Sequence, residues 1–138
     1  MIDLYTWTPD ERYDVIVASL FQTPVNPHDP AIAHRPPDFW GRNQLDHVIS
    51  LLPQALADGG VAYVLQLSIL SQERTVELLR QHGLQARVAD FGFLPWSETF
   101  ERSAEQIARV ERMSDAHHHR IGGSEVMIAY LLEITRAP

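Results

Sequence analysis

The 138-residue sequence contains no cysteine and no lysine, and these two absences remove several kinds of chemistry. Without cysteine there is no disulfide bond, no thiolate nucleophile and no cysteine-ligated zinc or iron–sulfur centre. Without lysine there is no catalytic amine and no phosphate-binding loop of the Walker type. All eleven basic residues are therefore arginines.

Long apolar runs and a positive net charge are also missing. No apolar segment approaches the roughly 18–20 residues that cross a bilayer, and the N-terminus lacks the basic and apolar regions of a signal peptide, so we expect a cytoplasmic protein without membrane contact. The net charge of −7 argues against a nucleic-acid partner, because such binding depends on neutralising phosphates. The length suits a single domain, residues 1–138.

What the sequence does contain is an alternation of strand-like and helix-like patterns. Short β-branched apolar runs typical of buried strands alternate with segments whose apolar residues recur at helical spacing. The expected strands are 14–19, 61–67, 85–93 and 126–134, and the expected helices are 39–57, 71–81 and 97–113. This βαβαβαβ order predicts an α/β fold with a largely parallel sheet and flanking helices.

Local signals set the expected boundaries of these elements. Five prolines make residues 22–37 a loop, and Pro53 should kink or split the first helix. Gly59 and Gly60 should end that helix, because glycine readily adopts the left-handed conformation of a C-terminal cap. Ser71 is a candidate N-cap for the second helix.

Three stretches together resemble the C-terminal half of class I S-adenosylmethionine-dependent methyltransferases. They are the aspartate-led strand YDVIVAS (13–19), the helix and Gly-Gly turn LLPQALADGGV (51–61) and the helix–glycine passage LLRQHGL (78–84). The resemblance covers about residues 1–134. It implies a partial Rossmann-like sheet in which the four strands follow the family's order 4-5-7-6, with the last strand antiparallel to its neighbours.

The residues after the first strand are similar to the family's Asn-Pro-Pro-Tyr motif in a variant form. The stretch SLFQ (19–22) is followed by TPVNP, where the family has a motif that grips the methyl-accepting atom. The resemblance places Ser19, Phe21 and Gln22 at the acceptor as catalytic residues. An ordinary strand-to-loop exit is the alternative, although ligands favour the carboxyl ends of strands in such sheets. The lost Asn and Tyr leave the acceptor, a small molecule or a peptide, undefined.

The resemblance also shows which part of the family's fold is missing. None of the seven glycines forms the Gly-x-Gly turn that binds the methyl donor, and Asp3 alone matches an adenine-contacting residue. S-adenosylmethionine is thus expected as a cofactor only where a partner half or an oligomer completes the site. In the complete fold the fourth strand pairs with the first, so Val15 to Ser19 should form an apolar edge that recruits a partner or a second copy.

Other candidate residues have two interpretations each. Trp40 and Asn43 follow the proline loop, where they close over a substrate, or else Trp40 caps the core while Asn43 begins the helix. Trp96 lines an acceptor pocket or belongs to the core. The run His117 to His119 suits a metal by residue type, but adjacent histidines in a loop point in different directions, so we expect no metal site.

The resemblance therefore implies a methyltransferase in which this chain supplies the acceptor-side half. The alternative is a non-catalytic half-domain that acts as an interaction or regulatory partner.

Overall fold

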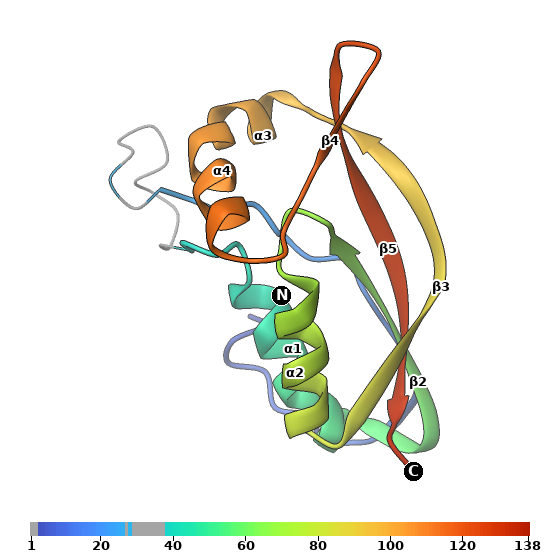
Figure 1. The fold of residues 1–138 in the computed structure, drawn as a ribbon. Helices are drawn as coiled ribbons and strands as arrows, with labels where there is room; N and C mark the ends of the chain where they lie inside the picture. Colours follow the sequence, from blue (N-terminus) through green and yellow to red (C-terminus); the bar gives the residue numbers. More distant parts are fainter. Residues whose placement is uncertain (1–2, 27, 29–37) are drawn as a thin grey trace.

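The computed structural model describes residues 3–26, 28 and 38–138, and it is an α/β structure with a mixed, open sheet of five strands (Figure 1). The stretch 27–37 of the expected proline loop therefore lies outside the described residues, apart from His28. The elements are β1 (Tyr13–Ala18), α1 (Asn43–Ala55), β2 (Leu56–Leu67), α2 (Gln72–Gln81), β3 (Leu84–Pro95), α3 (Glu98–Arg102), α4 (Ala104–Met113), β4 (His119–Ile121) and β5 (Ser124–Arg136).

The strands lie in the order β1-β2-β5-β3, and β4 forms a hairpin with the start of β5. β1 runs parallel to β2, whereas β5 runs antiparallel to both β2 and β3. The sheet is therefore mixed, whereas the alternation of strands and helices in the sequence predicted a largely parallel sheet. The reason is that β5 returns between β2 and β3 in the opposite direction, with Leu65 opposite Leu131 and Val88 opposite Leu132.

Helix α1 differs from the predicted helix at both ends. It begins at Asn43, and it continues through Pro53 to Ala55 as one helix, so the expected split does not occur. Pro53 removes one helical hydrogen bond, the one that its missing N–H would donate, and the helix ends two residues later at Ala55. Apolar residues on one side, among them Leu45, Ile49 and Leu52, are almost fully buried.

The Gly-Gly pair does not cap α1. The cap residue is Leu56, whose backbone is already extended, and β2 starts there. Gly59 has a φ of 75° inside a bulge of β2, between the pairs Tyr13–Leu56 and Val15–Val61. Glycine is thus needed for a bulge in a strand. A Gly-Gly pair in the sequence is compatible with either a helix C-cap or a bulge.

Helix α2 begins as predicted. The Ser71 hydroxyl accepts a hydrogen bond from the Arg74 backbone N–H at 3.1 Å, and Glu73 lies in the first turn. A second cap comes from far along the chain, because the carboxylate of Asp115 accepts from the backbone N–H groups of Gln72 and Glu73, each at 3.1 Å. The segment between α4 and β4 is thereby tied to the start of α2.

The predicted third helix is two helices. Ser103 separates α3 from α4, with its backbone N–H bonded to the Phe100 carbonyl at 3.0 Å, the tight spacing of a terminating turn. The segment between α4 and β5 also contains a short strand, β4, that pairs with the start of β5 across a turn at Gly122 and Gly123, both with positive φ. The helical spacing of apolar residues continues across such a break, so a single turn between two helices is not visible in the sequence pattern.

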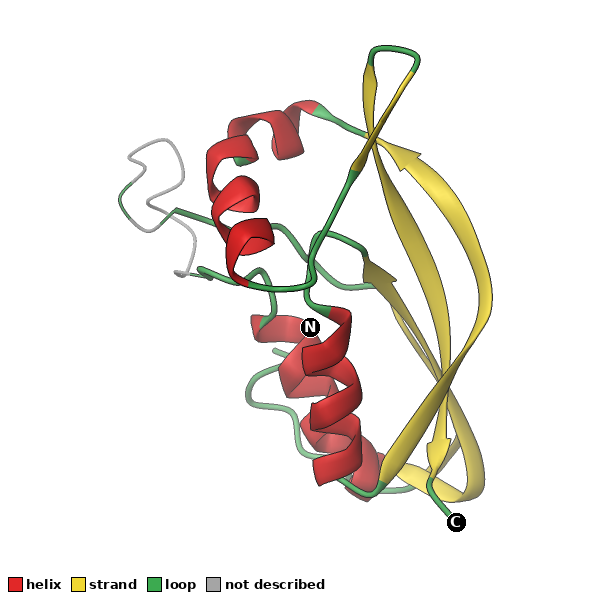
Figure 2. Ribbon diagram, viewed as in Figure 1, coloured by secondary structure: helices red, strands yellow, loops and turns green. Residues whose placement is uncertain are grey.

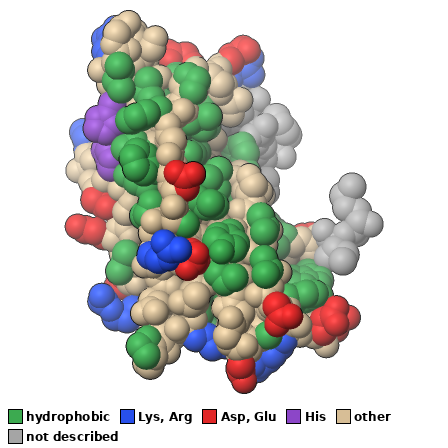
Figure 3. All heavy atoms as spheres, turned by 90° about the vertical axis from the view of Figure 1, so that its right-hand side faces the viewer, with side chains coloured by type: hydrophobic (Ala, Val, Ile, Leu, Met, Phe, Trp, Pro, Cys, Tyr) green, Lys and Arg blue, Asp and Glu red, His purple; other side chains and the backbone are tan. Residues whose placement is uncertain are grey.

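All four helices of the described chain lie on one side of the sheet, and the core fills the space between them and the sheet (Figure 2). The opposite side has no helix in the described part of the chain, and hydrophobic side chains gather over that face (Figure 3). The edge strand β1 is exposed there, with 57% of Val15 and 75% of Val17 accessible. None of the helices described is long and apolar enough to cross a bilayer.

Candidate functional site

The carboxyl ends of β1 and β2 lie at the same end of the sheet, because these two strands are parallel. The segment that follows β1 leads toward the start of α1, and β2 leads directly into α2. Open α/β sheets bind ligands at this end, where loops and helix N-termini meet. This is where the structure places most of the predicted site residues.

Gln22 is buried and its side chain is bonded to the backbone of β2. Its Oε1 accepts from the Leu67 backbone N–H at 2.9 Å, and its Nε2 donates to the Leu65 carbonyl. Only 3% of Gln22 is accessible. The side-chain amide thus makes the hydrogen bonds to β2 that a backbone group of β1 would make if β1 continued. Both its oxygen and its nitrogen are used in these bonds.

Ser19 lies directly after β1 and is exposed. It lines a hollow of about 300 Å³, mainly apolar, between β1, the N-terminal turn and α1, where it meets Leu4, Trp7 and Leu51. Phe21 is half-buried, and its backbone N–H donates to Oε1 of Gln44 on α1 at 2.9 Å. The three motif residues therefore follow one another along the chain but lie in different surroundings.

Asp3 lies in a turn beside the same hollow. Its carboxylate accepts from the Tyr5 backbone N–H at 2.9 Å, and its carbonyl accepts from that of Trp7 at 2.9 Å. The turn is held to α1 through the Leu4 carbonyl, which accepts from His47 Nε2 at 3.0 Å. The structure thus brings the turn that contains Asp3 beside the hollow that Ser19 lines, although Asp3 itself is not among the lining residues.

Trp40 and Asn43 line a second hollow of about 430 Å³ at the N-terminal ends of α1 and α2. Ser71, Arg74 and Met113 also line it. Trp40 is 41% accessible, and its ring meets Phe39 edge-on at 4.9 Å. Carboxylates already cap both helix starts, Asp38 at α1 and Asp115 at α2, so the exposed aromatic ring is the group here that is suited to holding a planar ligand.

Arg42 organises this second hollow, and sequence reasoning missed its role. Its guanidinium donates to Asp46 at 3.0 Å, to the Ser71 carbonyl at 2.6 Å and to the Thr75 hydroxyl at 2.8 Å. It thereby joins the first turns of α1 and α2 while only 5% accessible. The only sequence signal was an arginine four residues before an aspartate at a helix start.

Asp38 caps the start of α1. Its carboxylate accepts from the backbone N–H groups of Arg42 at 2.9 Å and Asn43 at 3.1 Å. Burial raises the pKa of Asp38, and these hydrogen bonds, with one from Gly41, offset the rise in part. Gly41 is required here, because it has a φ of 73° and an added Cβ would lie 2.7 Å from the Pro24 nitrogen.

Trp96 lies apart from the other candidates, after β3. It packs against the core, 4.7 Å from the ring of His118, and its indole nitrogen is buried without a hydrogen-bond partner among the described residues. His118 in turn lies between Glu111 and Glu125, at 2.7 Å from Nδ1 and 2.9 Å from Nε2. Within the described ranges no group of three or more His, Asp or Glu side chains could hold a metal ion.

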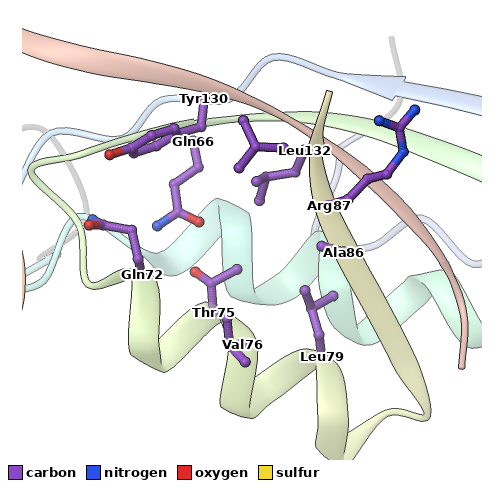
Figure 4. Close-up of a pocket in the computed structure, with 10 residues that line it drawn as sticks. Gln66, Gln72, Thr75, Val76, Leu79, Ala86, Arg87, Tyr130 and Leu132 are labelled. Carbon is purple, nitrogen blue, oxygen red and sulfur yellow. The ribbon is translucent and has the colours of Figure 1, made fainter. Parts of the chain in front are cut away.

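A third hollow, of about 150 Å³ and almost wholly apolar, separates α2 from β3 and β5 (Figure 4). Gln66, Gln72 and Tyr130 lie at one end of it, and Val76 and Leu79 lie on its α2 side. None of the residues predicted for the site is among those that line it. It is a separate feature of the helix-covered face.

Comparison with known proteins adds nothing to this geometry: no protein-family model matches the sequence, and no curated protein matches it.

Proposed function

We propose that this chain is the acceptor-side half of an S-adenosylmethionine-dependent methyltransferase, and that another polypeptide or segment supplies the donor-binding half. The strand arrangement carries the proposal. The order β1-β2-β5-β3, with β5 reversed between its neighbours, corresponds to the order 4-5-7-6 expected of the family's last four strands. The reversed strand between two parallel ones supports the proposal, because the resemblance implies the same reversal.

The arrangement at the carboxyl ends of β1 and β2 is consistent with methyl transfer. Ser19 and the turn of Asp3 flank one hollow, and Trp40 and Asn43 line another at the same end of the sheet. In this proposal Asp3 contacts the adenine, and Ser19, Phe21 and Gln22 surround the acceptor, a small molecule or a peptide. Positioning does most of the work in such a reaction, because the sulfonium is already a strong leaving group.

The alternative is a non-catalytic half-domain with a role in interaction or regulation. Two observations favour it: none of the seven glycines forms a Gly-x-Gly turn, and the Gln22 amide is bonded to the backbone of β2. Under this alternative the motif residues serve only to fix the exit from β1.

Titration calorimetry of S-adenosylhomocysteine, first into the purified chain and then into its mixture with a candidate donor-binding half, distinguishes these functions. Saturable binding in the micromolar range, weakened by Asp3→Asn and not by Asp10→Asn, would support a donor site that includes Asp3. Asp10 is a suitable control because it is an exposed aspartate in the same N-terminal segment. Absence of binding by the folded chain would exclude an enzyme formed by this half alone, and the same titration would then be repeated with a candidate donor-binding half.

A further inference from the structure

One edge of β1 is unpaired among the described strands, and β1 carries two exposed apolar side chains. β1 pairs with β2 on one side, and no described strand pairs with its other side. Val17 and Val15 are 75% and 57% accessible, so no described segment covers their side chains. An apolar edge of this kind pairs with another strand unless charges or a bulge prevent it.

The edge of β3 differs, although β3 is also exposed along most of its length. Its pairing with β5 is interrupted by a bulge between Val88 and Asp90, and Arg87 and Asp90 are charged. Bulges and charges are the devices by which edge strands avoid pairing. β1 has one charged residue, Asp14, and a register shift between Tyr13 and Val15, but its pairing is regular over the apolar part, from Val15 to Ala18.

We infer that β1 pairs with β1 of a second copy, antiparallel, about a two-fold axis at Ile16. This register sets Val15 opposite Val17 of the second copy, and the symmetry makes that contact twice. Asp14 lies opposite Ala18, so no like charges face each other. Directly opposed apolar pairs of this kind stabilise antiparallel strands.

Neighbouring registers are less favourable. A shift by two residues in one direction keeps Val15 opposite itself but sets Asp14 opposite Ile16. In the other direction it keeps Val17 opposite itself but sets Val15 opposite Ser19. A shift by one residue would turn each side chain toward the wrong face of the joined sheet. A second copy is therefore a well-matched partner strand, because in the register centred on Ile16 each residue from Val15 to Val17 faces another apolar residue.

The dimer would also change the candidate site. In this register Tyr13 of the second copy lies opposite Ser19, beside the hollow that Ser19 lines. A donor-binding half would need the same edge, so the dimer is the form of the chain alone, and a partner half would have to displace the second copy. The dimer goes beyond the proposed function and does not depend on it.

Light scattering over a dilution series tests this inference. A six-residue strand makes a short contact, so we expect a concentration-dependent equilibrium between monomer and dimer. Val17→Glu should shift the equilibrium to monomer by at least about tenfold in concentration, because a carboxylate would face an apolar side chain at both symmetry-related positions. Val88→Glu, on the edge of β3, should leave it unchanged, since Val88 is also half-exposed on an edge strand.

The register has its own test. Val15→Lys and Val17→Glu should each give monomers alone, and the double variant should dimerise again, because the introduced ammonium of one copy would then face the introduced carboxylate of the other, twice by symmetry. Circular dichroism checks that each variant is folded, and recovery in the double variant excludes misfolding as the cause. A monomeric wild-type chain, or dissociation by Val88→Glu in place of Val17→Glu, would overturn the inference, and a monomeric double variant would overturn the register. None of these outcomes decides methyl transfer, which the S-adenosylhomocysteine titration tests separately.

Discussion

The substitution Gln22→Met separates the two roles of the residue that the methyltransferase motif singles out. Methionine has a similar size and flexibility but no amide, so the change removes the two hydrogen bonds to β2 and keeps most of the packing. In the folded chain the Leu67 N–H and the Leu65 carbonyl would lose their partners. The wild-type amide is 3% accessible, so little water can replace it.

The expected loss is large for a chain of this size. Leaving a buried backbone group without a partner costs about 1–3 kcal/mol, so two groups cost about 2–4 kcal/mol after partial rearrangement. A domain of this length loses about 3 °C in Tm per kcal/mol, which gives a decrease of about 6–12 °C. Urea unfolding and calorimetry measure both quantities.

A matched control is Gln85→Met, because Gln85 is an exposed glutamine on β3. We expect its free energy of unfolding to change by less than about 0.5 kcal/mol. If Gln22→Met is as stable as Gln85→Met, the amide does not hold β2, and the structural account of Gln22 is wrong. Loss of S-adenosylhomocysteine binding without loss of stability would instead favour a ligand contact.

Three further changes test other parts of the structure. Gly41→Ala should lower the free energy of unfolding by about 2–4 kcal/mol, because strain at positive φ adds to a close backbone contact. Gly59→Ala, with a similar φ but open space around the added Cβ, should lower it by about 1 kcal/mol. Equal losses in urea unfolding would contradict this. Arg42→Lys should cost about 2 kcal/mol, since one ammonium cannot replace three guanidinium hydrogen bonds, and an unchanged Tm would refute it. Hydrogen bonds from Arg87 lower the pKa of Glu133. That contribution is present above the unfolded-state pKa and is lost as pH falls through the folded-state pKa, so Glu133→Gln should reduce the Tm difference between about pH 7 and about pH 3, and an undiminished difference would contradict it.

Much of the fold was predictable because its strands are buried apolar runs of β-branched residues. All four predicted strands occur, and the cap at Ser71 was correct. The errors arose where one sequence signal permits two structures. A Gly-Gly pair ends a helix or allows a bulge, and the bulge at Gly59 could be told from a cap only by the pairing of β1 with β2.

The candidate site was less accessible to sequence reasoning, because it depends on contacts between distant segments. Asp115 caps α2 from 43 residues away, and Gln22 reaches β2 across a similar separation. Trp96 was grouped with the other aromatic candidates by residue type, but β3 carries it away from them, to a place beside His118. Composition could not show these distances, and only the topology brings the groups together or separates them.

The position of β5 has a consequence for how the chain acquires its structure. β5 spans residues 124–136, the last described strand in sequence, yet it lies between β2 and β3. Until it has been synthesised, β2 and β3 have no common neighbour, and the earlier part of the chain holds two unjoined pieces of a sheet. Contacts between such distant segments slow folding and leave apolar strands exposed meanwhile. On the ribosome, the nascent chain would therefore complete its sheet only after residue 136 has left the exit tunnel.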